Sequence, residues 1–556
     1  MMKKTLIVLS FILCASSANA QLGKTEYEKI DSLFLDWNKP NNPGGSIGIV
    51  KEGEVVFSKA YGLASLEYLV PNTRETIFNI GSISKQFTAI GIIKLALEGK
   101  LSIEDDIRKY MPDLPDLGET VTIRHMLHHT SGLRSFHALL DLAGWRFDDS
   151  RDNEDLYRFM LKQRGLNFKP GSEFGYSNTN YMLMVNIIEK VTSEKFPEWM
   201  KKEIFQPLGM INTYIEEDYM SVASNNATSY YTNRSNDLFR AAPHWGYVGS
   251  ANVHSTTTDL LKWLGNFNNP QTGWETHFEM LITQDQLTDG GINNYAFGVL
   301  VNDNKGIKSI EHSGATGGYI SNMATYPEEN LSFVILTNFQ SSNVRQKSAD
   351  LFNILLGDQV KSKKALDQQN FKAVNLSEKD LKKFEGSYWD DIRNFERQIL
   401  LKNDTLRYSI PGRRDYAMVP VGNNEFQRLG GREETNIRFD ISGKTSNMII
   451  TWSNGDVYKS QRFEPVVSSK EELKAYAGTF YSPEVESAYT ISFDGEKLTG
   501  YHSRHGDFSM KRVRKDILEG RGPLRNVKFQ KNKKGEITGI FVSNGRVRNL
   551  WFKKQE

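Results

Sequence analysis

The last third of the chain repeats itself. The segment "LKKFEGSY" (residues 381–388) returns as "LKAYAGTF" (residues 473–480), 92 positions later, and a later "SNG" returns at a spacing of 90. A shared spacing of this kind is typical of a duplicated structural unit. Each copy consists of short apolar stretches between turn residues, which indicates β-strands, and a small sheet loses its exposed edges when it closes into a barrel. We therefore predict two all-β barrel modules, at residues 379–466 and 467–556.

The part of the chain before the repeat, residues 21–357, mixes helical and strand patterns. "SIGIVKEGEVVFSKAYG" (residues 46–62) predicts two strands joined by a tight turn, and "LSFVILTNF" (residues 331–339) predicts a buried strand. Helical patterns lie between them. Residues 358–378 are polar and lack periodicity, which predicts a linker. Because 556 residues exceed one ordinary domain, we expect three domains with these boundaries.

The N-terminus has the pattern of a secretory signal peptide. Lys3 and Lys4 precede a short apolar stretch, and an A-x-A site ends at Ala20, after which we expect cleavage. The apolar stretch is too short to span a bilayer, and no later segment is long enough, so we expect no transmembrane segment. The only cysteine, Cys14, lies inside this region. We predict a protein that is exported to the periplasm or secreted, without disulfides or cysteine ligands.

The composition argues against several function classes. Lys and Arg (69) nearly balance Asp and Glu (67), and the formal net charge is +2, which argues against nucleic acid as a partner. The sequence has no phosphate loop of Walker or Rossmann form. His125 and His129 have i, i+4 spacing, but no carboxylate follows as in zinc hydrolases, so a metal site is the weaker alternative. We expect neither cofactor nor metal, a small molecule or peptide as substrate, and cell-wall material as a further candidate partner. The sequence does not indicate the oligomeric state.

The stretch "NIGSISKQFTAIGIIKLALEGK" (residues 79–100) predicts a helix that is apolar on most sides and therefore buried. Ser82 and Lys85, at i and i+3, share one face at its N-terminus, where free N–H groups favour an oxyanion. A lysine flanked by Phe87 and Ile90 is desolvated, which lowers its pKa and lets it activate a serine. The alternative is a serine cap followed by a surface lysine.

Two later stretches carry compatible groups. Tyr176 and Asn178, in "YSN", lie before an apolar helix, where a phenol can transfer a proton and an amide can hold a lysine or a substrate carbonyl. The alternative is a capped helix with a core tyrosine. His312 and Gly314, in "HSG", open a strand, and glycine there permits close approach of a substrate backbone. For His312 alone, a structural role is the simpler interpretation.

The three motifs S-x-x-K, Y-x-N and H-x-G occur in this order along the chain. With them, the chain resembles the serine β-lactamase and penicillin-binding protein superfamily, in its class C-like and esterase-like branch. "VTIRHMLHHTSGL" (residues 121–133) and "GSANVHSTTTDLLKW" (residues 249–263) are also similar to family sequence. The resemblance covers about residues 45–356. It implies an α/β (α+β) domain, in which helices pack on an antiparallel sheet, with a helical subdomain and a cleft between them.

The resemblance also implies roles. Ser82 would be the acylated nucleophile, Lys85 and Tyr176 would share general-base and general-acid work, and Asn178 would orient them. The backbone N–H groups of Ser82 and Ala315 would form the oxyanion hole, which commonly provides most of the transition-state stabilisation in acyl transfer. Together these roles imply a serine hydrolase, either a peptidase or an esterase.

The third motif departs from many relatives. His312 and Gly314 would line the substrate side where many members have K-T-G, and a histidine is largely neutral near pH 7. This weakens the case for β-lactams and carboxypeptidase substrates, which place a carboxylate there. It favours esters, or peptides approached from the amino end. With two trailing β-modules, the layout is similar to bacterial D-aminopeptidases.

The leading hypothesis is therefore an exported serine hydrolase of D-amino-acid-containing peptides, acting through an acyl-enzyme. The alternatives are a carboxylesterase or weak β-lactamase and, in another class, a penicillin-recognising or cell-wall-binding protein without turnover. The D-aminopeptidase resemblance also implies that a loop of the last module reaches the cleft. The best candidate is residues 500–509, in which Asp507 could meet a substrate ammonium. The alternative is an ordinary hairpin loop.

Overall fold

The computed structural model describes residues 21–556 except 234, 305, 358, 360–372, 392–394, 411–414, 430–434, 442–444, 453–456 and 466–468. The predicted signal peptide, residues 1–20, lies outside the described residues, as does most of the predicted linker. Within the described part of the chain, no helix is long and apolar enough to cross a membrane. The module boundaries expected from the sequence stay predictions.

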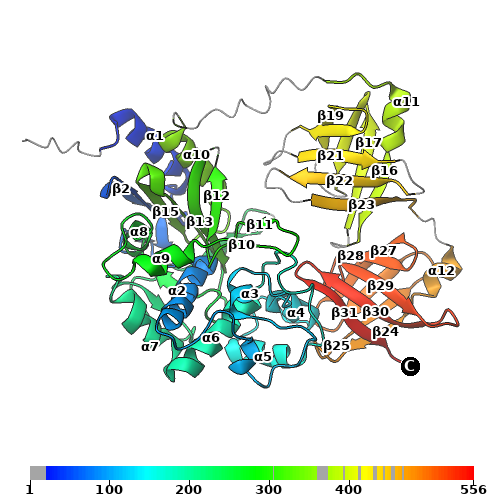
Figure 1. Ribbon diagram of the computed structural model, residues 1–556, viewed down its shortest axis with the longest axis horizontal. Helices are drawn as coiled ribbons and strands as arrows, with labels where there is room; N and C mark the ends of the chain where they lie inside the picture. Colours follow the sequence, from blue (N-terminus) through cyan, green and yellow to red (C-terminus); the bar gives the residue numbers. More distant parts are fainter. Residues whose placement is uncertain are drawn as a thin grey trace, which may run out of the picture.

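The first part of the chain is built on a six-stranded antiparallel sheet (Figure 1). In spatial order its strands are β12 (Leu300–Asn304), β13 (Ile307–Thr316), β14 (Tyr319–Tyr326), β15 (Leu331–Thr337), β1 (Gly45–Lys51) and β2 (Glu54–Tyr61). The predicted strand pair at residues 46–62 is confirmed as β1 and β2, and the buried run at residues 331–339 is β15. Because β1 pairs with β15, strands from the two ends of this part lie side by side in the sheet.

Helices cover both faces of the sheet. One face packs against α1 (Lys24–Phe34) and α10 (Val344–Leu356), which share an apolar cluster with β1, β14 and β15. The other face packs against α8 (Thr257–Gly265), with α9 (Glu275–Leu281) nearby. The short elements of this part are η1 (Leu35–Trp37), β3 (Leu63–Ser65), β4 (Val70–Pro71), β5 (Phe78–Asn79), η2 (Gly81–Ile83), η3 (Ile107–Lys109), η4 (Lys201–Phe205), β6 (Tyr214–Ile215), β7 (Tyr230–Thr232), β8 (Leu238–Arg240), β9 (Val253–Ser255), β10 (Asp285–Gln286), β11 (Ile292–Asn293) and η5 (Pro327–Glu329).

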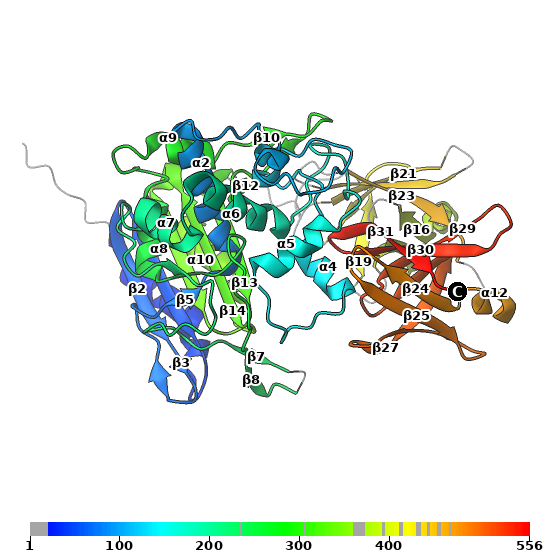
Figure 2. The same ribbon diagram turned by 90° about the horizontal axis from the view of Figure 1, so that it is seen from below.

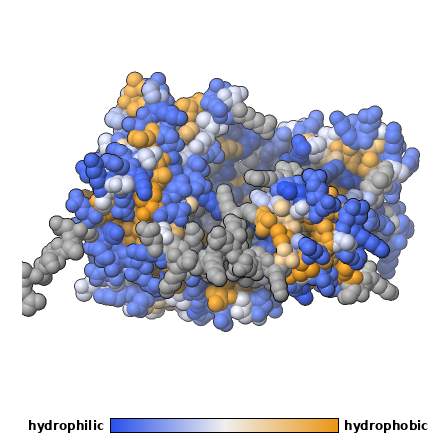
Figure 3. Space-filling model, turned by 90° about the horizontal axis from the view of Figure 1, so that it is seen from above, coloured by the Kyte–Doolittle hydropathy of each residue, from blue (hydrophilic) through white to orange (hydrophobic). Residues whose placement is uncertain are grey.

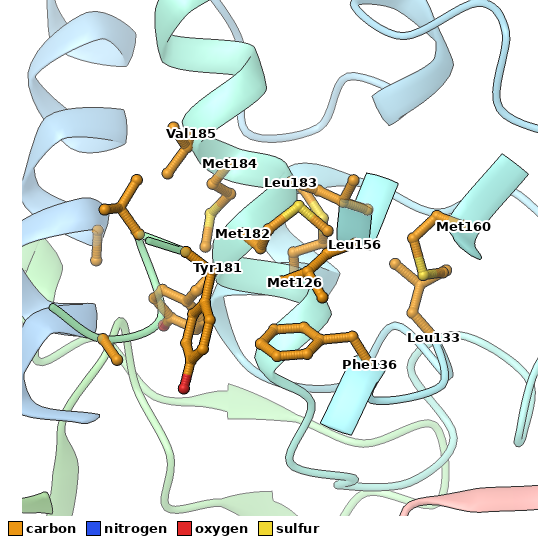
Figure 4. Packing of buried hydrophobic residues seen from close by; sticks show 14 of the residues in the cluster. Met126, Leu133, Phe136, Leu156, Met160, Tyr181, Met182, Leu183, Met184 and Val185 are labelled. Carbon is orange, nitrogen blue, oxygen red and sulfur yellow. The ribbon is translucent and has the colours of Figure 1, made fainter. Parts of the chain in front are cut away.

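A helical subdomain packs beside the sheet. Its helices are α2 (Ser84–Leu97), α3 (Ile123–Leu127), α4 (Phe136–Leu142), α5 (Asn153–Leu161), α6 (Asn178–Thr192) and α7 (Phe196–Met200). Every residue of α2 from Ser84 to Ile93 is buried, so the predicted buried helix is confirmed. Side chains of α6 such as Met182 and Leu183 pack among those of α3, α4 and α5 (Figure 4). This continuous core fixes the start of α2 relative to the start of α6.

Two closed eight-stranded barrels follow, which confirms the prediction of two all-β modules. The first contains β16 (Gly386–Asp390), β17 (Phe395–Lys402), β18 (Thr405–Ser409), β19 (Tyr416–Pro420), β20 (Glu425–Arg428), β21 (Thr435–Asp440), β22 (Asn447–Trp452) and β23 (Val457–Phe463). The second contains β24 (Gly478–Ser482), β25 (Ser487–Phe493), β26 (Leu498–His502), β27 (Gly506–Arg514), β28 (Ile517–Gly520), β29 (Asn526–Lys531), β30 (Ile537–Asn544) and β31 (Val547–Lys554). A short helix precedes each barrel, α11 (Glu378–Leu381) with η7 (Lys382–Phe384) and α12 (Lys470–Lys474).

The glycines shared by the two repeats have the same structural role. Gly386 and Gly478 begin the first strand of each barrel with φ of 145° and 156°. A Cβ on either glycine would lie 2.9 Å from the side chain of the closing strand, Arg462 in the first barrel and Lys554 in the second. Positive φ and crowding both favour glycine. The repeated residue therefore marks the closure of each barrel.

The second barrel docks on the helical subdomain, beside α4 and α5 (Figure 2). The Tyr489 hydroxyl donates to the Leu142 carbonyl at 2.9 Å. Arg134 pairs with Glu484 at 2.7 Å, with side chains only 5% and 7% exposed. The first barrel contacts the second through an apolar cluster that includes Trp389 and Val513. The face shown in Figure 3 is mostly hydrophilic with separate apolar patches.

We expect the buried ion pair between Arg134 and Glu484 to stabilise the contact between the second barrel and the helical subdomain. Replacing Glu484 by alanine should cost about 3–5 kcal/mol, because Arg134 would remain buried without its partner. The backbone N–H of Arg164, which donates to the same carboxylate at 2.8 Å, would also lose its acceptor. Urea unfolding of the full chain measures the loss.

The matched control is the exposed pair of Arg158 and Glu154, at 2.6 Å with side chains 61% and 75% exposed. The change Glu154→Ala should cost less than about 1 kcal/mol. Equal losses in Glu484→Ala and Glu154→Ala would contradict the assigned role of the buried pair.

Candidate active site

Ser82 and Lys85 lie together at the start of the buried helix. Ser82 is in η2, one turn before the bulk of α2, and its side chain is half-buried. Lys85 is fully buried, and its Nζ lies 3.1 Å from Ser82 Oγ. The same Nζ donates to the Ser250 carbonyl at 2.8 Å. The structure thus brings together the hydroxyl and the amine that the sequence placed on one helical face.

Burial holds the pKa of Lys85 well below its ordinary value, and the charge of Arg546 lowers it further. No carboxylate pairs with this amine among the described residues. Its surroundings are the rings of Tyr176, at 4.9 Å from Nζ to the centroid, and Tyr181, at 5.7 Å. Desolvation disfavours the ammonium form. A lysine in this setting can hold a lone pair beside the serine hydroxyl.

Tyr176 is the third group at this point, in the turn before α6. His129 supports that turn, because its Nδ1 accepts from the Ser177 N–H at 3.2 Å and lies 3.0 Å from the Asn180 amide. Burial raises the pKa of Tyr176 to about 12, although the nearby Ser82 hydroxyl and the Arg546 charge oppose the rise. The phenol is therefore protonated near neutral pH and can act as a proton donor.

Asn178 opens α6 and is 8% exposed. Its Oδ1 is buried and has no hydrogen-bond partner among the described residues. The side chain therefore makes no hydrogen bond through Oδ1 to Lys85, and the orienting role implied by the resemblance stays a prediction.

Strand β13, which lies between β12 and β14 in the sheet, packs against η2. Gly314 packs on the turn before Ser82 so closely that a Cβ would lie 2.0 Å from the Ile80 carbonyl. Gly81 has φ of 55°, and a Cβ there would lie 2.7 Å from the Ala315 nitrogen. Both glycines permit this approach because they lack a side chain. The Ala315 nitrogen thereby lies against the turn that carries Ser82, and its role in an oxyanion hole stays a prediction.

His312 is buried in β13 and neutral. Its Nδ1 lies 2.7 Å from the Ser313 carbonyl, so this nitrogen carries the proton and donates it. Its Nε2, 3.0 Å from the Tyr295 hydroxyl, then accepts. Burial lowers the pKa of His312 to about 3, and the nearby Lys85 contributes. The third motif therefore offers no cation at neutral pH, as the sequence led us to expect.

The three histidines at 125, 128 and 129 make separate contacts. His125 Nδ1 accepts from the Thr122 N–H at 3.2 Å, which caps α3, and His128 Nδ1 donates to the Tyr295 carbonyl at 2.9 Å. The described residues include no cluster of three or more His, Cys, Asp or Glu side chains that could hold a metal.

Two contributors at the site are missed by sequence reasoning. The Ser250 carbonyl belongs to the backbone, so its role does not depend on the side chain at that position. Arg546, from the second barrel, lies over the Tyr176 ring with 4.6 Å between Cζ and the ring centroid. It stands in a turn with no catalytic motif, and nothing in its own sequence context points to the site.

The expected loop of the last module is not the one that reaches Tyr176. Residues 500–509 form parts of β26 and β27, and Asp507 is exposed without a contact to the site. Arg504, from the turn between them, pairs with Asp149 at 2.7 Å instead. The turn between β30 and β31, which carries Arg546, reaches Tyr176. Residues 500–509 do face the helical subdomain, since His505 Nε2 also lies 2.9 Å from the Asp141 carbonyl, but no contact joins them to Tyr176 among the described residues. The expectation that Asp507 meets a substrate ammonium stays a prediction.

Known proteins share this architecture. The family model described as Beta-lactamase matches residues 32–357. Protein flp of Staphylococcus aureus (strain MRSA252) is 29% identical over 335 residues, which cover 58% of this chain and 65% of that protein. The chain thus spans less than two thirds of the length of this relative.

Solved structures extend the likeness to the fold. The octameric penicillin-binding protein homologue from Pyrococcus abyssi aligns with a TM-score of 0.53 at 26% identity, over 78% of this chain and 99% of that one. The D-amino acid amidase from Ochrobactrum anthropi SV3 aligns with a TM-score of 0.51 at 22% identity, over 60% and 99%. The latter shows likeness of fold alone. With the family match over more than half of its length, the chain belongs to the beta-lactamase family of serine hydrolases.

Proposed function

We propose that this protein hydrolyses amides or esters through an acyl-enzyme on Ser82. The observation that carries the proposal is the buried Lys85 amine, 3.1 Å from Ser82 Oγ and without a carboxylate partner among the described residues. A serine needs a base to become a nucleophile, and a lysine acts as one only when its pKa is depressed. Burial provides that depression here.

Acylation would begin at this pair. Neutral Lys85 keeps two N–H bonds, one of which can stay on the Ser250 carbonyl while the lone pair takes the Ser82 proton. Ser82 Oγ then bonds to the substrate carbonyl carbon, and the carbonyl oxygen becomes an oxyanion. The backbone N–H groups of Ser82 and Ala315 would stabilise that charge.

Collapse of this intermediate breaks the bond to the leaving group, which must gain a proton. Tyr176 would supply it from its phenol and recover it from the Lys85 ammonium, so that both groups return to their starting state. In deacylation, water loses a proton to the same pair and bonds to the acyl carbon. Ser82 Oγ leaves with a proton, and the acid product departs.

We extend the proposal to export, through the predicted signal at residues 1–20, and to D-amino-acid-containing peptides as substrates. Neutral His312 and the fold likeness to a D-amino acid amidase support such substrates. Activity on a panel of 4-nitrophenyl esters and of D- and L-amino acid 4-nitroanilides tests this. Selective cleavage of D-anilides supports a peptidase, whereas ester cleavage alone would favour a carboxylesterase. Release of no more than one equivalent of product would indicate a binding protein.

The pH dependence of kcat/KM should report Lys85. Activity requires the neutral amine, so it should fall as the pH drops through the pKa of Lys85, at a midpoint well below the ordinary value of about 10.4. His312, with a pKa of about 3, adds no second step between pH 5 and 9. Tyr176, with a pKa of about 12, stays protonated over the same range. A profile with a neutral ester measures the midpoint.

The control for this profile is His312→Gln, which can still accept from the Tyr295 hydroxyl. The midpoint should stay where it is in that variant, whatever happens to the rate. A midpoint near pH 10 in the unaltered protein would contradict a neutral Lys85, and a midpoint that moves with His312 would reassign the base.

A further inference from the structure

The second barrel delivers one arginine to the active site on a fixed turn. Arg546 lies between β30 and β31, and its carbonyl accepts from the Asn167 side chain at 2.9 Å and the Ser135 N–H at 3.3 Å. The neighbouring Asn544 side chain donates to Asp141 at 2.7 Å. The backbone of the turn is thus held on the helical subdomain at three points. Its position does not depend on the Arg546 side chain.

The Arg546 guanidinium has no ion-pair or hydrogen-bond partner among the described residues. Its Cζ lies 4.6 Å from the centre of the Tyr176 ring, and the residue is exposed. Among the described residues, no carboxylate pairs with it and no acceptor takes a hydrogen bond from it. Nearby arginines differ: Arg548 pairs with Glu173 at 3.0 Å, and Arg134 pairs with Glu484 at 2.7 Å. Arg546 therefore stands beside the reacting groups without a counter-ion.

The position of Arg546 favours a role in binding an anion over a role in proton transfer. A guanidinium keeps its charge and cannot exchange a proton with Ser82, so it is not an alternative base. Over the Tyr176 ring, a guanidinium can offer its N–H groups as a planar fork, which matches the two oxygens of a carboxylate. His312 is neutral, so the third motif supplies no competing cation. The charge that the third motif lacks is instead present over the ring of Tyr176.

We propose that Arg546 binds a carboxylate of the substrate, so that the preferred substrate is an anionic amide or ester. A short peptide with a free carboxylate close to the scissile bond has this chemistry. The inference rests on the proposed hydrolase function and narrows its substrate class. It also reverses the expectation that neutral His312 disfavours carboxylate-bearing substrates, because the cation comes from another domain.

The test uses pairs of substrates that differ only in charge. On the leaving-group side the pair is D-alanyl-glycine and D-alanyl-glycinamide, and on the acyl side it is 4-nitrophenyl hydrogen adipate and 4-nitrophenyl methyl adipate. The measured quantity is the ratio of kcat/KM between the charged and neutral members. For at least one pair, Arg546→Gln should lower this ratio about 10- to 100-fold, the range for losing a hydrogen bond to a charged group. Arg546→Lys should retain part of it.

The matched control is Lys533→Gln. Lys533 is an exposed cation in the turn between β29 and β30, at the opposite end of the same barrel, and it should leave both ratios within about twofold. An unchanged ratio for both pairs in a folded Arg546→Gln protein overturns the proposal. So does an equal loss in the Lys533 variant, which would indicate a nonspecific effect of charge.

Binding separates this inference from the proposed function. Calorimetry with the Ser82→Ala protein measures affinity for D-alanyl-glycine and its amide, and for adipate and its monomethyl ester, without turnover. The more anionic member should bind more tightly in at least one pair, and adding Arg546→Gln should remove that preference. If Ser82→Ala shows the binding preference but Ser82 of the unaltered protein forms no acyl adduct, the hydrolase proposal fails and anion recognition stands. If Ser82 is acylated but no preference exists, only the anion proposal fails.

Discussion

Replacing Ser82 by alanine is expected to abolish turnover, with a loss in kcat on the order of 10⁶-fold, as for removal of a hydrolase nucleophile. The oxyanion hole and the substrate contacts remain in such a variant, but no oxygen is left to form the acyl bond. Lys85 would keep its hydrogen bond to the Ser250 carbonyl at 2.8 Å, so the site should not collapse. The loss of activity would therefore come from the missing nucleophile and not from a change in the structure of the site.

Intact-protein mass spectrometry with a fluorophosphonate probe checks the assignment directly. The unaltered protein should gain one adduct, and Ser82→Ala should gain none. Ser84→Ala is the matched control, because Ser84 lies two residues away and its hydroxyl is buried as the acceptor of the Val253 N–H at 3.0 Å. That variant should still be labelled. A Ser82→Ala protein that carries the adduct would place the nucleophile elsewhere.

The single changes Lys85→Ala and Tyr176→Phe should each reduce kcat by about 100-fold or more, the usual effect of losing a general acid or base. The double variant should lose much less than the product of the two losses. Both groups handle the same proton at Ser82, and Lys85 Nζ lies 4.9 Å from the Tyr176 ring centroid. Residues that act as one unit give non-additive losses.

The control is Lys94→Ala on the same helix. Lys94 pairs with Glu98 at 3.0 Å near the far end of α2, and its removal should change kcat less than about twofold. Single-turnover kinetics with an activated ester separates acylation from deacylation in all variants. If the losses from Lys85→Ala and Tyr176→Phe multiply fully, the two residues act in independent steps.

Much of the fold is readable from the sequence because its signals are local or repeated. The apolar run after Ser82 predicts a buried helix, and every residue from Ser84 to Ile93 is buried. The repeat predicts two similar modules, and Gly386 and Gly478 prove to begin equivalent strands in two closed barrels. Periodicity and repeat spacing are properties of the sequence itself, so they predict helices, strands and repeated modules before any tertiary contact is known.

The sequence by itself also determined which groups meet at the start of α2. Ser82 and Lys85 are three positions apart, and helical geometry alone places them on one face. It likewise determined that the third motif carries a neutral group, since His312 has no permanent charge. The adjacency of Gly81 and Ala315, by contrast, joins residues from distant segments. It depends on how closely β13 packs against η2, which only the folded chain shows.

The cation at the site was decided by the tertiary structure alone. Asn167 and Arg546 are 379 positions apart, and their hydrogen bond exists because the second barrel docks on the helical subdomain. Residues 500–509 looked better suited by composition, yet the turn after β30 reaches Tyr176. A loop's residues describe its own conformation, whereas the surface it meets follows from the packing of two domains. Local pattern thus determined the proposed reacting pair, Ser82 and Lys85, and long-range packing determined which charge lies over Tyr176.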